Sequence, residues 1–110
     1  MAKKRMFDNA IIDQDNFVDM PMSTKGLYFL LGMQADDYGF VSPRRVMRTH
    51  MATDDDLKLL IAKGFVLQFE TGVIVIVHFL KNNYLNKSKI TMTEFREELS
   101  QLILLNLYYL

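Results

Sequence analysis

The chain has 110 residues, enough for one domain with a hydrophobic core and too few for two independent ones. Thirteen lysines and arginines balance thirteen acidic residues, so no overall field would draw it to nucleic acid or to an anionic membrane, and such binding needs a local patch. It contains no cysteine, which excludes a disulfide framework, a thiolate metal site and a thiol nucleophile. The longest aliphatic run, residues 73 to 77, is far too short to cross a membrane, and we expect a soluble, cytoplasmic protein.

The first 22 residues carry apolar side chains among acids and amides, without a helical or alternating period. We expect an ordered arm that packs on the domain. After it, Ser23 can cap a helix in which Leu27, Leu30 and Leu31 fall at helical spacing. This helix should end before Asp36.

A second helix is predicted from about Pro43 to His50, after a short extended piece at residues 40–41. Ser42 is a suitable N-cap, and proline fits the first helical position because its missing N–H has no partner there. Helical spacing predicts an inward stripe made by Val46, Met47 and His50. The outer face is then basic, with Arg44 and Arg48 one turn apart and Arg45 beside them.

The third predicted helix begins after Thr53, and Asp56 three positions later completes the spacing of a capping box. Its buried stripe would be Leu57, Leu60 and Ile61. Gly64 can take the left-handed conformation just past the helix end, which lets Phe65 fold back toward Leu60. Asp54 and Asp55 fill the first turn, where carboxylates stabilise the positive end of the helix dipole, a reading we favour over a metal site.

Two β-branched and aromatic runs follow, "FVLQF" and "VIVIVHF", and Glu70, Thr71 and Gly72 separate them as in a tight hairpin. Residues 81–92 are irregular and basic, and a last helix is predicted over residues 93–110. The end of that helix is apolar on every side and therefore needs cover.

Three helices and a hairpin, with a short strand after the first helix, are the elements of a winged helix-turn-helix. We therefore predict an α+β fold in which residues 23–80 form the winged helix and the C-terminal helix is an addition. Another small α+β domain is the alternative. Fold alone does not establish DNA binding.

The best electrostatic candidate for DNA binding is the outer face of the second helix, because the first helix of a helix-turn-helix pair crosses the DNA backbone. An ordinary solvated face is the alternative. Basic residues outside this helix could add to the patch. The predicted DNA-binding set is Arg44, Arg45, Arg48, Lys3, Lys4, Arg5, Lys87 and Lys89.

The third helix is poorly equipped to read bases, since its outward residues Asp55, Leu59 and Ala62 are not the side chains that recognise base edges. The hairpin tip has no positive charge. An outward leucine and alanine suit burial against another helix, either the C-terminal one or that of a second copy. The predicted oligomer interface is Leu59, Ala62, Leu102, Leu104, Leu105 and Tyr108.

No catalytic constellation or metal site is predicted, and no cofactor is implied. His50 and His78 lie far apart in the sequence, on a predicted inner stripe and on a strand, where structural roles are commoner than ligation.

The stretches "LYFLLGMQADDYGFV", "DDDLKLLIAKGF" and "KNNYLNKSK" are the most specific parts of a resemblance that spans about residues 5–89. The chain resembles the N-terminal domain of phage and prophage replisome organisers, which are DnaD-like replication initiation proteins. The resemblance implies a winged helix in the cytoplasm of a bacterial host that binds origin DNA or self-associates there and recruits host helicase-loading proteins. One alternative is a homo-oligomerisation or protein-interaction winged helix with little DNA affinity, and a second is a transcriptional regulator.

Overall fold

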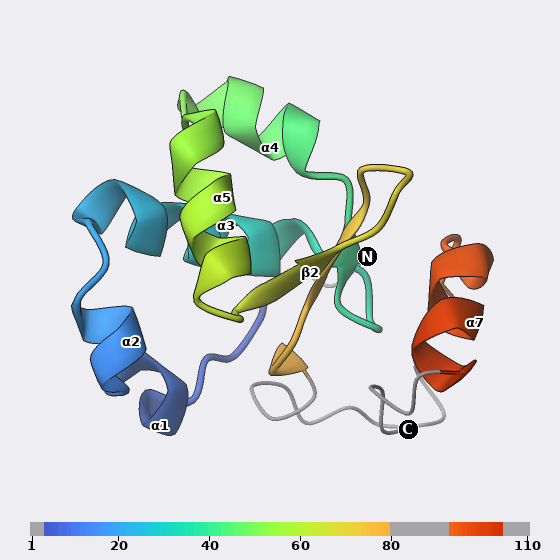
Figure 1. Cartoon of the computed structure of the whole chain (residues 1–110), viewed down its shortest axis with the longest axis horizontal. Helices are drawn as coiled ribbons and strands as arrows, with labels where there is room; N and C mark the ends of the chain where they lie inside the picture. The colour runs from blue at the N-terminus through green and yellow to red at the C-terminus, as the bar shows by residue number, and fades with distance from the viewer. Residues whose placement is uncertain (1–3, 80–92, 105–110) are drawn as a thin grey trace.

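Residues 4–79 and 93–104 are described by a computed structural model of the chain. Within these ranges the chain forms six helices and a three-stranded antiparallel sheet, so its class is α+β (Figure 1). The elements in chain order are α1 (Asn9–Ile12), α2 (Asp15–Val18), α3 (Met22–Gln34), β1 (Phe40–Val41), α4 (Pro43–His50), α5 (Asp54–Ala62), β2 (Val66–Gln68), β3 (Ile74–Ile76) and α7 (Arg96–Leu104).

The N-terminal arm contains two one-turn helices that its sequence did not reveal. The Asp8 carboxylate caps α1 by accepting a 2.7 Å hydrogen bond from the backbone N–H of Ala10. In α2 the buried ring of Phe17 meets the rings of Tyr28 and Phe65 edge to face, at centroid distances of 5.4 and 5.5 Å. Tertiary contacts of this kind hold helices that are too short to be stable alone.

The start of α3 corrects the prediction that Ser23 caps it. The helix begins at Met22, directly after Pro21, and no side chain caps it. Ser23 lies in the first turn, and its hydroxyl donates a 2.8 Å hydrogen bond to the Asp56 carboxylate at the start of α5. The residue therefore joins two helices.

Helix α4 begins with Pro43 at the predicted position and ends at His50. Met51 then takes a left-handed conformation with φ of 59°, and the next N–H, that of Ala52, donates to the Met47 carbonyl at 2.9 Å. The expectation of an inward His50 is wrong, because the buried stripe is made by Pro43, Val46 and Met47, and the chain turns away at His50, which is exposed.

Both ends of α5 are as predicted. Thr53 and Asp56 form a reciprocal capping box, in which each backbone N–H donates to the other side chain, at 3.2 and 3.3 Å. At the other end Gly64 has a φ of 82°, and the N–H of Phe65 donates to the Leu60 carbonyl at 3.0 Å. Only glycine adopts this conformation at little cost, and the resulting hydrogen bonds complete the helix end.

The sheet has the order β1-β3-β2, so the second strand of the hairpin lies in the middle. Side chains alternate between two faces of the sheet, as the pleat requires. One face points into the main core and carries Val41, Val66, Ile74 and Ile76. The opposite face carries Phe40, Leu67 and Val75, which face one another in the register Phe40–Val75–Leu67.

Helix α7 covers this second face, beside the hairpin (Figure 1). Leu99 is buried there and Phe95 packs against the same cluster. The described part of the helix ends at Leu104, within the predicted range, and the predicted continuation to residue 110 lies outside the described residues. Among the described residues, no helix combines the length and the apolar character that a membrane crossing requires.

Candidate nucleic-acid interface

A groove of about 410 Å³ lies where α4, α5 and the β2–β3 hairpin meet. Its floor is apolar and its rim is mostly basic. The floor residues are Pro43, Met47, Ala52, Leu57 and Ile61, and the rim carries Arg44, Arg48, Lys58, Asp54 and Gln68. Among the described residues the groove therefore combines three cationic side chains with one carboxylate.

Arg44 and Arg48 reach the groove because they are four residues apart in α4, so they lie on one face one helical turn apart. The inward positions Val46 and Met47 fix the rotation of the helix and leave both arginines exposed. Lys58 comes from α5 and is also exposed. Sequence spacing did not identify Lys58, because only the packing of α5 against α4 brings it to the two arginines.

Arg45 does not share this surface. It lines a second cavity, of about 460 Å³, between the end of α3, the start of α4 and the segment before α7. Asp36, Asp37 and Glu94 line the same cavity together with Arg5, so carboxylates outnumber the basic groups around Arg45. The three arginines of α4, predicted as one patch, are thus divided between two sites.

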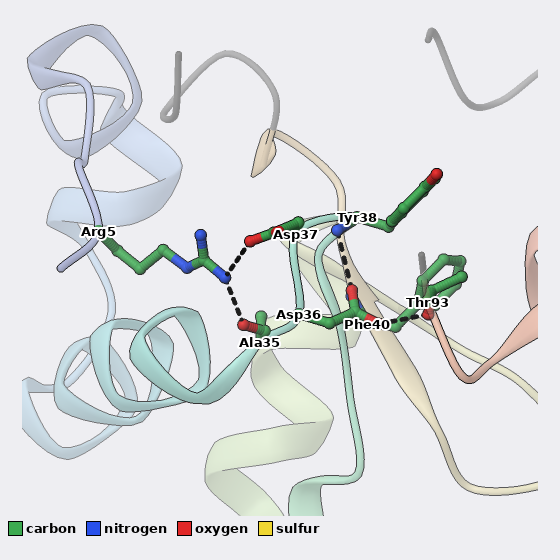
Figure 2. Close-up of polar contacts among 7 residues, drawn as sticks. All are labelled: Arg5, Ala35, Asp36, Asp37, Tyr38, Phe40 and Thr93. Atoms are coloured by element: carbon green, nitrogen blue, oxygen red, sulfur yellow. Dashed lines mark hydrogen bonds and ion pairs between the residues drawn. The ribbon is translucent and has the colours of Figure 1, made fainter. Parts of the chain in front are cut away.

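Arg5 is buried, which corrects the expectation that it binds DNA. Its side chain is 3% exposed, and one guanidinium nitrogen lies 3.1 Å from Asp37 and donates to the Ala35 carbonyl at 2.8 Å (Figure 2). The guanidinium also lies over the Phe79 ring, 5.1 Å from its centroid. A guanidinium group buried in this way stabilises the fold and is not accessible to a phosphate.

The other predicted basic residues are not gathered at the groove. Lys4 is exposed in the arm, and it does not line either cavity. Lys3, Lys87 and Lys89 lie outside the described residues. Their role in DNA binding remains a prediction.

Asp36 organises the turn from α3 to β1. One carboxylate oxygen accepts hydrogen bonds from the backbone N–H groups of Tyr38 and Phe40, at 2.9 and 3.1 Å, and the other accepts from the Thr93 hydroxyl (Figure 2). Gly39 in the same turn has a φ of 90°, and a Cβ placed on it would lie 2.7 Å from the Phe79 side chain. The turn is thereby shaped locally and joined to the segment that leads into α7.

The acidic residues at the start of α5 have a largely structural role. Asp56 is buried, and its carboxylate accepts from the hydroxyls of Ser23 and Thr24 at 2.8 and 2.9 Å as well as from the Thr53 N–H. Burial by itself would raise the pKa of Asp56, but the hydrogen bonds together outweigh it and hold the pKa below its usual value. Asp54 and Asp55 remain exposed, and Asp54 lines the groove.

The predicted oligomer interface receives limited support. Leu59 is half-buried and packs on the main core, which corrects the expectation that it points outward, because the core extends around α5 beyond the predicted stripe. Ala62 is exposed as expected. The side chains of Leu102 and Leu104, and the whole of Leu105 and Tyr108, lie outside the described part of the chain.

Within the described ranges, no group of three or more histidine, cysteine, aspartate or glutamate side chains could hold a metal ion. His50 is exposed, and the ring of His78 lies 6.3 Å from that of Phe65. Comparison with protein-family models, with curated proteins and with solved structures found no match for the chain.

Proposed function

We propose that this chain is a winged helix-turn-helix module that binds DNA mainly through phosphates and serves a phage-type replication initiation protein without catalysing a reaction. The order of its elements supports the first part. A helix, a short strand, two helices and a hairpin follow one another in α3, β1, α4, α5, β2 and β3, and β1 pairs beside β3 as the third strand. The resemblance of residues 5–89 to replisome organisers supports the assignment to replication initiation.

The observation that carries the DNA-binding proposal is the convergence of Arg44, Arg48 and Lys58 on one groove. In helix-turn-helix docking the first helix of the pair crosses the phosphate backbone, and in the proposed winged helix α4 is that helix. Guanidinium groups bind phosphate oxygens in bidentate geometry, and an ammonium adds a mobile charge. Three contacts of this kind suit a moderate, salt-sensitive affinity.

The proposed contact is with phosphates rather than bases for two reasons. The exposed residues of α5 include Asp55 and Ala62, which do not recognise base edges, and Asp54 at the rim repels DNA. The hairpin tip carries Glu70 and is engaged by α7 through Thr71, which opposes its insertion into a groove of DNA. A transcriptional regulator, in contrast, needs a strong sequence preference.

The test is the salt dependence of binding to a short labelled duplex, measured by fluorescence anisotropy between about 0.05 and 0.2 M salt. Three phosphate contacts predict a slope of log affinity against log salt of about −2.7, and Arg44→Ala/Arg48→Ala should reduce it to about −0.9. The matched control is Arg45→Ala/Arg96→Ala, which removes two exposed positive charges outside the groove and should keep the slope.

An affinity that does not depend on salt would contradict the proposal, as would equal losses in the two double variants. The same assay with duplexes of unrelated sequence separates the alternatives. Similar affinities fit phosphate binding, whereas a hundredfold preference for one duplex, about 2.7 kcal/mol, would indicate a sequence-specific regulator.

A further inference from the structure

The groove has a floor that a DNA backbone does not use. Met47, Leu57 and Ile61 form an apolar surface below the rim, and none of the described lining residues is aromatic, so the floor offers no stacking platform for bases. The rim carries three cations and one carboxylate, Asp54, so its net charge is positive. An apolar floor with such a rim is complementary to a ligand with an apolar centre and flanking carboxylates that meet the arginines.

The chain itself carries such a surface on its arm. Between residues 6 and 24 there are four aspartates and no lysine or arginine. In and just after α2, the exposed residues Asp15, Val18 and Asp19 are spaced i, i+3 and i+4, which places them on one side of the turn. Val18 is 53% exposed, a large value for an aliphatic side chain, while its neighbour Phe17 is buried.

The two surfaces match in spacing as well as in charge. Asp15 and Asp19 are one helical turn apart, as are Arg44 and Arg48 on the groove rim. Two carboxylate–guanidinium pairs can therefore form together, with Val18 between them directed at the apolar floor. The arm helices and α4 lie at different sides of the molecule in Figure 1, so the pairs cannot form within one copy.

We propose that the groove is the docking site for the acidic ridge, Asp15–Val18–Asp19, of a second copy of this chain. The contact joins two different surfaces, so a pair of copies still has one free groove and one free ridge, and association continues head to tail. Because the ridge covers Arg44 and Arg48, a groove that holds a ridge cannot bind DNA in the proposed way at the same time. This last consequence rests on the proposed function, but the docking itself does not.

Sedimentation velocity over a concentration series up to about 1 mM tests the proposal. The wild-type chain should associate at low salt, and the association should weaken strongly at about 0.5 M salt, where the Debye length is only about 4 Å. Asp15→Lys/Asp19→Lys and Arg44→Glu/Arg48→Glu should each weaken it by about tenfold or more, because like charges then face each other.

An equimolar mixture of the two charge-reversed variants should associate again, since each variant's ridge then matches the other's groove. The mixture also shows that both variants remain folded and competent. Glu94→Lys/Glu97→Lys is the matched control, because it changes two exposed carboxylates near and in α7 and should leave association intact. A wild type that is monomeric throughout, an association that does not respond to salt, or a mixture that stays monomeric would overturn the proposal.

The arm variant separates this inference from the proposed function. Asp15→Lys/Asp19→Lys leaves the groove unchanged, so it should lose self-association and retain the salt slope for DNA. If the charge-reversed mixture associates but no variant binds DNA, the docking stands and the DNA-binding proposal fails. If the protein binds DNA but the mixture stays monomeric, the DNA-binding proposal stands and the docking proposal fails.

Discussion

The Thr71 hydroxyl at the tip of the hairpin donates a 2.7 Å hydrogen bond to the carboxylate of Glu98, a buried residue of α7. Residues 27 positions apart thus join the turn of the hairpin to the helix that covers the outer face of the sheet. Position 71 is exposed, and the sequence marks it only as part of a turn.

Thr71→Val should destabilise the fold, because it removes the donor and leaves the Glu98 carboxylate in the same buried place. We expect a loss of about 1–3 kcal/mol in the free energy of unfolding, measured by urea denaturation. Ser100→Ala is the control, since Ser100 is exposed on the same helix and its hydroxyl donates to the Arg96 carbonyl one turn earlier. Equal stabilities of Thr71→Val and wild type would show that the hydrogen bond contributes nothing in solution.

Asp56 should make stability depend on pH in the acidic range. Its pKa in the folded state lies below the ordinary value of 3.8, so its contribution is fully present above that value and is lost as the pH falls through the folded pKa. Asp56→Asn should cost about 1–3 kcal/mol at neutral pH, because an amide nitrogen cannot accept from the Thr53 N–H.

The difference between wild type and Asp56→Asn should therefore narrow as the pH is lowered below 3.8. Thermal unfolding followed by circular dichroism across this range gives the measurement. Asp55→Asn is the matched control, since Asp55 is exposed in the same helical turn. A difference that stays constant with pH would mean that the carboxylate charge is not what stabilises the junction of α3 and α5.

Arg5 should behave as a residue of the core rather than of a DNA surface. Arg5→Ala removes the ion pair with Asp37 and the cation over Phe79, and we expect a loss of about 3 kcal/mol in the free energy of unfolding. Arg5→Lys should recover only part of it, because an ammonium does not reproduce the planar geometry. Under conditions where both variants are folded, the salt slope of DNA binding should equal that of wild type. A reduced slope would return Arg5 to the DNA-binding set.

Met51→Gly should stabilise the chain. The residue is 88% exposed and has a φ of 59°, a conformation that costs a side-chain-bearing residue about 1 kcal/mol and glycine very little. We expect a net gain of about 0.5 kcal/mol in urea unfolding, after the larger backbone entropy of unfolded glycine is subtracted. Thr49→Gly, exposed within α4, should instead destabilise by several tenths of a kcal/mol. Equal losses for both glycine variants would indicate that position 51 is not strained.

The parts of the fold that were predictable from sequence depend on neighbouring residues. Proline at the start of α4, the reciprocal cap at Thr53 and Asp56, and Gly64 at the end of α5 are all local signals, and the structure has these helices at the predicted places. The helices of the arm were missed because α2 is held by the contact of Phe17 with Phe65, which lies 48 residues later.

Part of the candidate site was also predictable from the sequence. Helical spacing correctly placed Arg44 and Arg48 on one face of α4. Arg45 was grouped with them because it is adjacent in the helix, and Arg5 was added only because it is basic. Neither argument reveals that Asp37 pairs with Arg5, or that Arg45 lines a different cavity together with three carboxylates. Lys58 was not included in the predicted DNA-binding set, because its position beside the arginines depends on how α5 packs against α4.

The strand order has a consequence for the behaviour of the unfolded chain. The run "VIVIV", residues 73 to 77, has the composition of a segment that forms amyloid-like sheets. In the folded chain β3 lies between β1 and β2, so both of its edges are hydrogen-bonded, and the outer strands are only two and three residues long. β1 lies far earlier in the sequence than β3, so the β1–β3 pair closes a longer loop than the β2–β3 hairpin and should form later. Until then one edge of the run is open, and aggregation during refolding should therefore depend on how quickly the turn at Asp36 brings β1 into place.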